Sequence, residues 1–223
     1  MTKTTNNPFR VARYLMGAAK LDQLPPDMGI EVALAGRSNA GKSTALNAIA
    51  DQKSLAKTSK TPGRTQLINL FRIDESNRLT DLPGYGFAKV SKDQKAQWQK
   101  TLSLYLQERK CLKALVVFMD IRHPLKETDK EMVRWAVNAQ IPVHVVLSKA
   151  DKLKSGARKT ALLAANKRLI RISETITSQL FSATSKLGLD DLIVKLANWY
   201  EFEEKTSESS TPADSEIKNH KSG

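Results

Sequence analysis

Eight consecutive residues near the start of the chain have the order expected of a loop that binds phosphate. They read GRSNAGKS and fit the pattern G-x-x-x-x-G-K-S, in which glycines let the backbone curl and turn its amide groups towards an anion. Lys42 is expected to reach the β- and γ-phosphates of a nucleotide, and Ser43 to place its hydroxyl on Mg²⁺. The predicted phosphate contacts are Gly36, Arg37, Ser38, Asn39, Ala40, Gly41, Lys42 and Ser43.

A second candidate contact follows about forty residues later, where an aspartate precedes a Pro-Gly pair. In a D-x-x-G turn of this kind, the carboxylate lies near the metal, usually through a water, and the glycine N–H senses the γ-phosphate. The same residues also suit an ordinary turn. Their place at the end of a predicted strand, after a phosphate loop, favours the nucleotide role. The predicted contacts are Asp81, Leu82, Pro83 and Gly84, with Asp81 reaching Mg²⁺ through a water.

The segment between these two motifs carries two threonines that could complete the metal site. A loop that orders around Mg²⁺ and a γ-phosphate needs a hydroxyl ligand. We prefer Thr65, because the Pro-Gly turn before it can present its hydroxyl, and Thr61 is the alternative. The predicted catalytic residues are therefore Lys42, Thr65 and Gly84, and the predicted direct metal ligands are Ser43 and Thr65.

The residues directly after Leu147 are similar to the [NT]-K-x-D pattern that recognises guanine. The carboxylate of Asp151 can accept hydrogen bonds from both N1–H and the 2-amino group of guanine, whereas adenine presents a lone pair at N1. A site built on such pairing can reject the wrong base by about 10⁴–10⁵. The stem of Lys149 is expected to lie along the base, and the Ser148 hydroxyl to tie loops together. The predicted base contacts are Ser148, Lys149, Ala150 and Asp151.

A short motif further along the chain offers one more contact with the base. It comprises Phe181, Ser182 and Ala183, and the Ala183 N–H can donate to the guanine O6. This motif is weak alone, but the order and spacing of all five elements predict a GTPase. An ATP-dependent kinase on the same phosphate loop is the alternative. The S-K-A-D residues and the missing lid for a second substrate argue against it.

These motifs need a sheet that brings their loops together, and the apolar runs predict one. Short apolar strands that alternate with amphipathic helices indicate a mainly parallel sheet with helices on both faces. The predicted fold is α/β, a three-layer P-loop NTPase of the Ras-like type with a mostly parallel six-stranded sheet. We expect strands over 30–35, 68–73, 78–81, 114–119, 143–147 and 179–181, and helices over 43–50, 92–107, 158–172 and 190–200, with a further helix through 132–136.

Length and composition indicate one domain with short extensions. In this chain of 223 residues we expect a docking segment at 1–28, the nucleotide-binding domain at 29–202 and a disordered, Ser-, Glu- and Lys-rich tail at 203–223. A transit peptide is the alternative for the first segment. The chain has a single cysteine and lacks the roughly 20 consecutive apolar residues of a membrane helix. We therefore expect a cytoplasmic protein with no membrane partner, and we also expect a monomer.

The net charge of +13 belongs to the predicted domain rather than to the tail. The tail holds five acidic and three basic residues, so the net charge without it is +15. Such a field favours nucleic acid or another polyanion as a partner. The alternative is an exposed helix face with no partner. The clustered basic residues are Lys53, Lys57, Lys60, Lys152, Lys154, Arg158, Lys159, Lys167, Arg168 and Arg171.

The combination of motifs resembles the EngB (YihA/YsxC) family of bacterial GTPases, in the TrmE-Era-EngA-EngB-Septin-like class. The resemblance covers residues 8–200 and rests on GRSNAGKS, TSKTPGRTQLINLF, DLPGYGFAKV, DIRHP, SKAD and FSA. It implies an EngB-type G domain that depends on Mg²⁺ and acts in assembly of the large ribosomal subunit, on ribosomal RNA. It also implies defects in growth and in division, including septation, when the protein is lost. Ser148, where the family commonly has Thr, is the one departure.

The resemblance also implies nucleotide contacts in the loop before the D-x-x-G turn. The family's binding segments map onto residues 36–43, 63–67, 81–84, 148–151 and 181–183, and its metal ligands map onto Ser43 and Thr65. The additional contacts implied are Gly63, Arg64, Thr65, Gln66 and Leu67.

Intrinsic hydrolysis is expected to be slow. Ras-like enzymes carry a water-orienting Gln after the D-x-x-G turn, and this chain has Tyr85 there, whose phenol cannot do the same. One hypothesis is that Asn39 holds K⁺, which replaces an arginine finger; the alternative is that Asn39 only shapes the loop. For the protein as a whole, the alternative is a basic RNA- or ribosome-binding scaffold in which GTP or GDP is structural.

Overall fold

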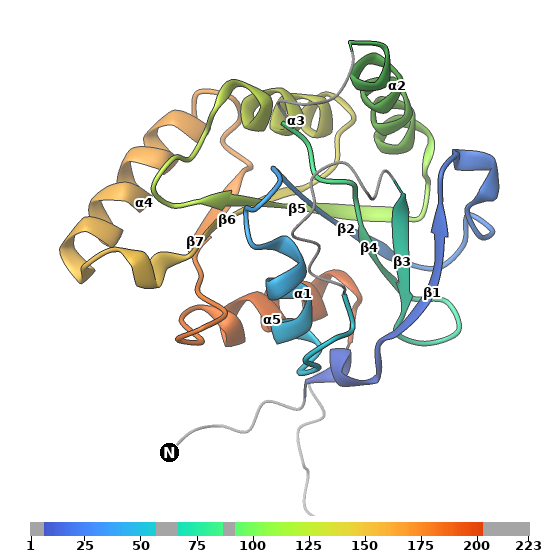
Figure 1. The fold of residues 1–223 in the computed structure, drawn as a ribbon, viewed down its shortest axis with the longest axis horizontal. Coiled ribbons are helices and arrows are strands. Elements are labelled where there is room, and N and C mark those ends of the chain that lie inside the picture. The colour runs from blue at the N-terminus through green and yellow to red at the C-terminus, as the bar shows by residue number, and fades with distance from the viewer. Residues whose placement is uncertain (1–6, 57–66, 87–91, 203–223) are drawn as a thin grey trace, which may run out of the picture.

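The computed structural model describes residues 7–56, 67–86 and 92–202, and within these residues seven strands form one sheet (Figure 1). The strand order is β1-β3-β4-β2-β5-β6-β7. Strands β4, β2, β5, β6 and β7 run parallel, whereas β3 is antiparallel to both of its neighbours. The bounds are β1 (Arg13–Ala18), β2 (Glu31–Gly36), β3 (Ile68–Arg72), β4 (Arg78–Asp81), β5 (Leu112–Asp120), β6 (Val143–Ser148) and β7 (Thr177–Leu180).

The predicted α/β class and the mostly parallel sheet are confirmed, but the predicted number of six strands is wrong. The additional strand is β1, which pairs with β3 at the edge of the sheet. It belongs to the segment 1–28, for which the sequence predicts only docking. Most of its side chains are exposed or half-buried. An edge strand of this kind lacks the apolar run that predicts a core strand.

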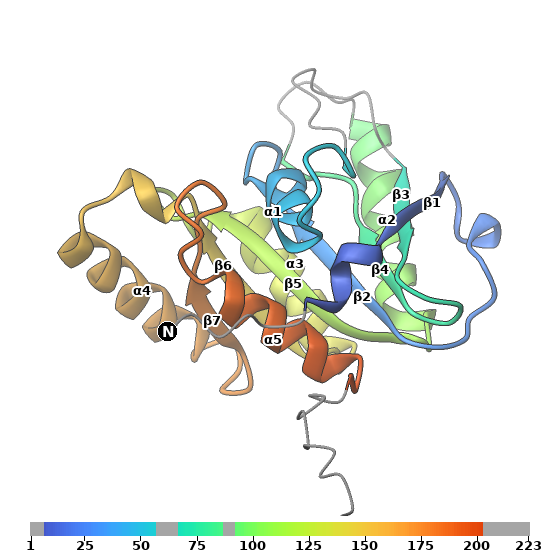
Figure 2. The ribbon, with the colours of Figure 1, turned by 90° about the horizontal axis from the view of Figure 1, so that it is seen from below.

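Helices cover both faces of the sheet (Figures 1 and 2). Helices α1 and α5 share one buried core with the sheet, and α2, α3 and α4 share the other. No helix in the described part of the chain is long and apolar enough to cross a membrane. The bounds are α1 (Lys42–Ile49), α2 (Lys92–Glu108), α3 (Glu127–Asn138), α4 (Ser155–Leu169) and α5 (Leu189–Trp199), with short 3₁₀ helices at Pro8–Val11, Leu21–Gln23 and Ala150–Lys152.

Strand β5 shows why an unbroken apolar run forms the centre of the sheet. Leu115 and Val117 pack into the core shared with α2, α3 and α4, whereas Val116 and Phe118 pack into the core shared with α1 and α5. Because side chains alternate along a strand, such a run suits a strand that is covered on both faces. Each large apolar side chain buried in this way contributes about 1.5–3 kcal/mol.

The parallel arrangement brings the C-terminal ends of four neighbouring strands to one edge of the sheet. Strand β2 ends at Gly36, β4 at Asp81, β5 at Asp120 and β6 at Ser148. Ligands of open α/β sheets bind at this edge. Three of these strand ends carry the motifs predicted to bind nucleotide, and the fourth carries the D-I-R-H-P segment.

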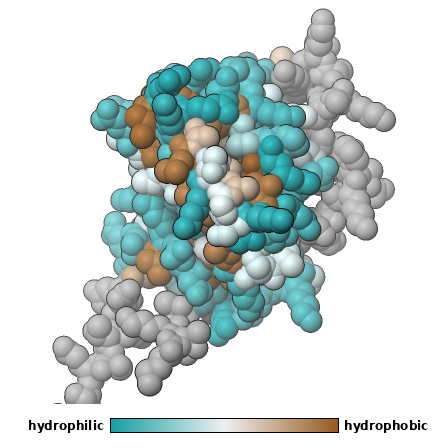
Figure 3. Space-filling view, turned by 90° about the vertical axis from the view of Figure 1, so that its left-hand side faces the viewer, coloured by the Kyte–Doolittle hydropathy of each residue, from teal (hydrophilic) through white to brown (hydrophobic). Residues whose placement is uncertain are grey.

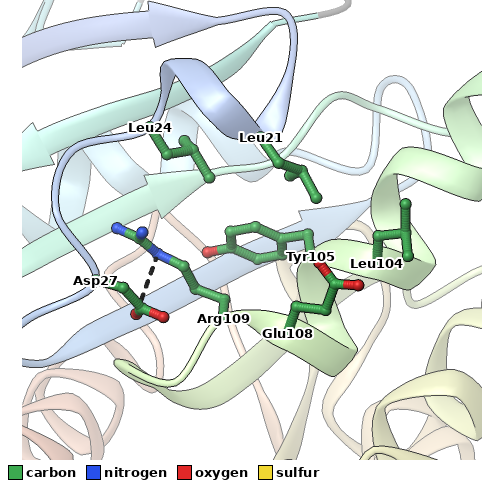
Figure 4. A pocket seen from close by; sticks show the side chains of 7 residues that line it. All are labelled: Leu21, Leu24, Asp27, Leu104, Tyr105, Glu108 and Arg109. Carbon is green, nitrogen blue, oxygen red and sulfur yellow. Dashed lines mark ion pairs between the residues drawn. The ribbon is translucent and has the colours of Figure 1, made fainter.

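A buried charge cluster surrounds Glu31, the first residue of β2. It lies at the end of this strand that is opposite to the candidate nucleotide site. The Glu31 carboxylate is fully buried, accepts a hydrogen bond from the Tyr105 hydroxyl, and pairs with Arg78 at 3.4 Å and with Arg109 at 3.0 Å. A cavity of about 180 Å³ lies beside the cluster, between helix α2 and the chain before β2. Figure 4 shows the Arg109 guanidinium there, next to Asp27. The cluster therefore attaches the segment before β2 to the end of α2.

Candidate functional site

The phosphate-loop motif lies between β2 and α1, as the sequence predicts. Its glycines occupy positions that other residues cannot take without strain. Gly41 has a φ of 86°, in the left-handed region, and directly precedes α1. A Cβ atom at Gly36 would come within 2.8 Å of the Phe118 carbonyl oxygen. The loop therefore depends on glycine at both ends, and it leads into a helix N-terminus, whose free amide groups attract anions.

Lys42 and Asp81 lie together at this loop. The Lys42 Nζ contacts the Asp81 Oδ1, and the two side chains are 9% and 11% exposed. Asp81 reaches this position because β4 pairs in parallel with β2, which sets Asp81 opposite Leu34. Ser43 follows Lys42 in the first turn of α1. A lysine for phosphate, a hydroxyl and a carboxylate thus meet at one edge of the sheet, as a P-loop requires.

The oxygen donors at this edge suit Mg²⁺. This ion prefers oxygen ligands and binds through one or two protein groups together with substrate phosphates and waters. Ser43 and Asp81 supply such donors. Bound there, the ion would neutralise charge that develops on the phosphates. Leu67 directly precedes β3. The predicted residues that lie outside the described part of the chain are Thr61, Gly63, Arg64, Thr65 and Gln66.

Backbone hydrogen bonds join the D-L-P-G turn to the phosphate loop. The Ser38 N–H donates to the Tyr85 carbonyl at 3.0 Å, and the Tyr85 N–H donates to the Gly36 carbonyl at 3.3 Å. Gly84 is therefore held beside the loop and is half-buried. The side chain of Leu82 and the proline after it are buried in the protein, so the backbone of this turn is the part that can face a phosphate.

The Tyr85 side chain points into the protein. It is 3% exposed, and its hydroxyl donates a hydrogen bond to Asp129 Oδ1 of α3 at 3.1 Å. The Arg37 Nε lies 3.3 Å from the same oxygen, and another Arg37 nitrogen donates to the His123 carbonyl at 3.0 Å. Burial raises the pKa of Tyr85 well above its ordinary value, and burial also raises the pKa of Asp129. Tyr85 is thus hydrogen-bonded to α3, and the guanidinium of Arg37 contacts both α3 and the loop before it.

The first two residues of the S-K-A-D motif lie over the phosphate loop. Ser148 is buried, and its hydroxyl donates a hydrogen bond to the Ala40 carbonyl at 2.5 Å. The carbonyl of Met119 in β5 lies 3.1 Å from the same hydroxyl. The Lys149 Nζ donates to the Asn39 carbonyl at 2.6 Å and lies 3.2 Å from Asp120 Oδ2. The prediction that the Ser148 hydroxyl ties two loops together is confirmed.

Asp151 lies beside the third segment of the candidate base site. Its Oδ1 accepts a hydrogen bond from the Ser182 hydroxyl at 2.6 Å, and this bond lowers the pKa of Asp151. The Ala150 N–H donates to the Phe181 carbonyl at 3.0 Å. An ionised carboxylate accepts two hydrogen bonds from one edge of guanine. The Phe181 ring is buried, which leaves the backbone of this loop, including the Ala183 N–H, as the candidate contact with the base.

Two charged residues, Asp120 at the end of β5 and Arg122 just after it, lie beside the candidate site, although the sequence pattern predicts no role for either. Arg122 donates to both oxygens of Asp120, from Nε to Oδ1 at 2.9 Å and from a terminal nitrogen to Oδ2 at 2.7 Å. This bond holds the pKa of Asp120 well below its ordinary range. Asp120 is the first charged residue after a buried apolar run, at the same edge as the other motifs. That position is the signal that could have found it.

Comparison with known proteins assigns the chain to a family. A family model described as "50S ribosome-binding GTPase" matches residues 31–149. The probable GTP-binding protein EngB of Photorhabdus laumondii subsp. laumondii is 56% identical over 195 residues, which cover 87% of this chain and 93% of that protein. The chain belongs to the EngB family. Its EngB relative in Coxiella burnetii (strain CbuK_Q154) is 50% identical over 204 residues, covering 91% of this chain and 100% of that protein. As a member of this family it is a GTP-binding protein and a GTPase, which hydrolyses GTP.

Two solved structures share the fold seen here. A crystal structure of a probable GTP-binding protein EngB aligns with a TM-score of 0.61 at 20% identity, over 78% of this chain and 100% of that chain. A structure of Era in complex with MgGDPNP and nucleotides 1506–1542 of 16S ribosomal RNA aligns with a TM-score of 0.57 at 22% identity, over 77% of this chain and 57% of that chain. At this level of identity the likeness shows the fold alone.

Proposed function

We propose that this EngB-family GTPase acts as a switch in assembly of the large ribosomal subunit, and that normal growth, division and septation depend on it. The observation that carries the proposal is a basic helix next to the candidate guanine site. Helix α4 begins at Ser155, four residues after Asp151. It contains Arg158, Lys159 and two further basic residues but no acidic residue. The matched family's description as ribosome-binding supports the same partner.

Exposed basic side chains on α4 and directly beside its two ends are available to a polyanion. Lys154, Lys159, Lys167 and Arg171 are exposed, and none of them forms an ion pair with another residue in the described ranges. Figure 3 views the side of the molecule on which α4 lies, and this side is mainly hydrophilic. Lysine and arginine side chains of this kind bind the phosphate backbone of nucleic acid. We therefore propose ribosomal RNA as the direct contact of α4.

Nucleotide can control this contact because the base motif and α4 are close in the chain. Only the short 3₁₀ helix Ala150–Lys152 and two further residues separate Lys149 from α4. We propose that a change in the position of the base motif on nucleotide binding is passed to the start of the helix through this short connection. The GTP state is proposed to favour ribosome binding, and hydrolysis to release the protein. We also propose that the protein is a monomer and acts in the cytoplasm.

Binding to purified large ribosomal subunits, with a GTP analogue or with GDP, tests the proposal. If α4 and its neighbours contact six to ten phosphates, affinity falls by about 10³–10⁵ between 50 and 200 mM salt. The variant Lys159→Glu/Lys167→Glu should bind much more weakly. The control Lys20→Glu/Lys110→Glu carries the same charge change at exposed positions outside α4 and should bind as the unchanged protein does. Salt-independent binding, or equal loss in both variants, would contradict the proposal.

A scaffold in which the nucleotide is structural also accounts for the basic helix. The two functions differ in what the ribosome does to turnover. A switch should hydrolyse GTP slowly alone, because Tyr85 occupies the water-orienting position and is bound to Asp129. Ribosomal particles should then accelerate hydrolysis. A rate that particles leave unchanged favours the scaffold.

For the nucleotide site itself, we propose the roles that the motifs predict. The amides of residues 36–43 bind the phosphates, and Lys42 neutralises the β- and γ-phosphates. Ser43 and Thr65 coordinate Mg²⁺ directly, and Asp81 contacts it through a water. Gly84 senses the γ-phosphate, and Asp151 selects guanine. The contact of Lys42 with Asp81 and the bond from Ser182 to Asp151 support these assignments.

Replacing the proposed guanine-selecting carboxylate tests the base assignment. Asp151→Asn exchanges an acceptor for a donor, so the variant should lose affinity for GTP and gain affinity for XTP, whose 2-oxo group accepts a hydrogen bond. ATP should remain a poor ligand of both proteins. Binding constants for the three nucleotides decide the matter, and an unchanged order of preference contradicts the assignment.

A monovalent cation at Asn39 is a separate proposal. Asn39 has a φ of 64°, so the loop adopts a left-handed turn at this residue. We propose that its side chain holds K⁺ near the phosphates, where the ion would take the part of an arginine finger. Turnover should then be faster in KCl than in NaCl. Identical rates would mean that Asn39 only shapes the loop.

A further inference from the structure

Asp120 connects three parts of the site. It is the last residue of β5, and its side chain is 12% exposed. Its orientation is set by Arg122, which donates to Oδ1 from both Nε (2.9 Å) and the backbone N–H (3.1 Å), and to Oδ2 from a terminal nitrogen at 2.7 Å. The Lys149 Nζ lies 3.2 Å from the same Oδ2. Arg122 thus holds the Asp120 carboxylate in the orientation in which Oδ2 faces Lys149.

Lys149 depends on partners outside its own motif. Its φ is 56°, in the left-handed region that a residue with a Cβ rarely adopts. Its long side chain would be free to move in water, but here the Nζ is held between Asp120 and the Asn39 carbonyl of the phosphate loop. One of these partners is charged and the other is neutral. Asp120 is therefore the one of these two partners that carries a charge opposite to that of the lysine.

From this arrangement we propose that Asp120 is a positioning residue for guanine nucleotides. It holds Lys149 with its stem across the phosphate loop, along the plane that the base would occupy, and Arg122 holds Asp120. The inference rests on the proposed assignment of Lys149 to the base site. Asp120 itself touches neither base nor phosphate in this scheme, so its loss should weaken nucleotide binding and leave the hydrolysis step alone.

Release and affinity of GDP, measured on the full chain, test the inference. Asp120→Asn keeps the shape of the side chain but removes its charge, and should weaken GDP binding about 10- to 100-fold, mainly through faster release. Turnover at saturating GTP should stay the same, so the change appears in KM and not in kcat. Arg122→Gln should also weaken GDP binding and speed GDP release, by a smaller factor. Arg134→Gln, which removes an exposed arginine that pairs with Glu127, is the control and should change neither.

A double-mutant cycle with Lys149→Met separates positioning from general structural support. Lys149→Met alone should weaken GDP binding, and adding Asp120→Asn to it should cost nothing further, because the lysine on which Asp120 acts is gone. Effects that add in full would overturn the inference. If Lys149→Met binds GDP normally, the base assignment of Lys149 fails, and the inference fails with it.

Two further outcomes concern Asp120 directly. Normal GDP binding by Asp120→Asn, together with weak binding by Lys149→Met, would overturn the inference and leave the base assignment intact. Thermal unfolding without nucleotide checks that each variant is folded. If Asp120→Asn does not fold, Arg122→Gln decides, since Arg122 is 45% exposed and can be replaced without opening the core. Unchanged GDP release in that variant overturns the inference.

Discussion

The Tyr85 hydroxyl donates a hydrogen bond to Asp129 Oδ1 at 3.1 Å, and this bond joins the end of the D-L-P-G-Y segment to helix α3. Both residues are buried, and Arg37 of the phosphate loop approaches the same carboxylate. The side chain that occupies the place of a catalytic Gln therefore serves to connect α3 with the phosphate loop. We therefore expect slow intrinsic hydrolysis, because this phenol is bound to Asp129 and cannot orient water as a Gln does.

Tyr85→Phe is expected to lower stability and to spare hydrolysis. The variant loses one buried hydrogen bond to a carboxylate, which costs about 1.5–3 kcal/mol in the free energy of unfolding. The intrinsic turnover number should stay close to that of the unchanged protein, because the phenol does not orient water. Urea unfolding and single-turnover hydrolysis measure the two effects. Tyr14→Phe, at an exposed tyrosine of β1, is the control for stability; a large loss of turnover in Tyr85→Phe would refute the assignment.

Ser148→Ala is expected to loosen the contact between the base motif and the phosphate loop. The Ala40 carbonyl would lose its hydrogen bond in a buried place, at a cost of about 1–3 kcal/mol. GDP should dissociate faster, and the free energy of unfolding should fall. Ser148→Thr keeps the hydroxyl and is the matched control. Equal GDP release rates in the Ala and Thr variants would show that the hydroxyl is not needed.

Glu31→Gln is expected to be strongly destabilising, although Glu31 lies far from the nucleotide edge of the sheet. The Arg78 and Arg109 side chains, both 8% exposed, would keep their charge beside a neutral amide. Breaking a buried ion pair in this way costs about 3–5 kcal/mol. Chemical denaturation measures the loss. Glu201→Gln disrupts an exposed pair with Lys113 and should cost less than about 1 kcal/mol; similar losses in both variants would argue against the buried cluster.

Stability is expected to fall in mild acid because of His144. Burial lowers the pKa of His144 from 6.5 to about 4, and its ring contacts Thr177 at 2.8 Å and Gln179 at 3.0 Å. Below pH 6.5 the unfolded chain binds a proton at this residue that the folded chain does not, so stability is complete above pH 6.5 and is lost as the pH falls towards 4. The loss amounts to about 3 kcal/mol by pH 4.

His144→Gln removes the titrating group and provides the comparison. The free energy of unfolding of this variant, measured at several pH values between 4 and 7, should depend on pH less steeply than that of the unchanged protein. Parallel pH profiles for the two proteins would assign the acid loss to other groups. Asp27 contributes little to the loss of stability between pH 7 and 4. The pKa of Asp27 is lowered to about 2, so most of the stability that this carboxylate contributes is lost below that range.

The sequence was sufficient for the features that depend on local geometry. A phosphate loop needs glycine where the backbone is left-handed or passes close to another strand. In the structure Gly41 is left-handed and Gly36 lies close to Phe118 of β5. The order and spacing of the phosphate loop, the D-x-x-G turn and the S-K-A-D motif then predicted a GTPase. Short, unbroken apolar runs that alternate with amphipathic helices predicted the α/β class, since buried parallel strands and helices differ in their hydrophobic patterns.

Only the tertiary structure decided which side chains meet across the site. Asp120 and Lys149, or Tyr85 and Asp129, are far apart in the sequence, and their contact depends on strand order and register. The edge strand β1 was equally hidden, because a strand exposed on its outer side needs few apolar residues. A motif consists of residues that are neighbours in the chain, so the sequence alone shows it. Ion pairs between distant residues and the edges of a sheet depend on tertiary packing, so they became visible only in the structure.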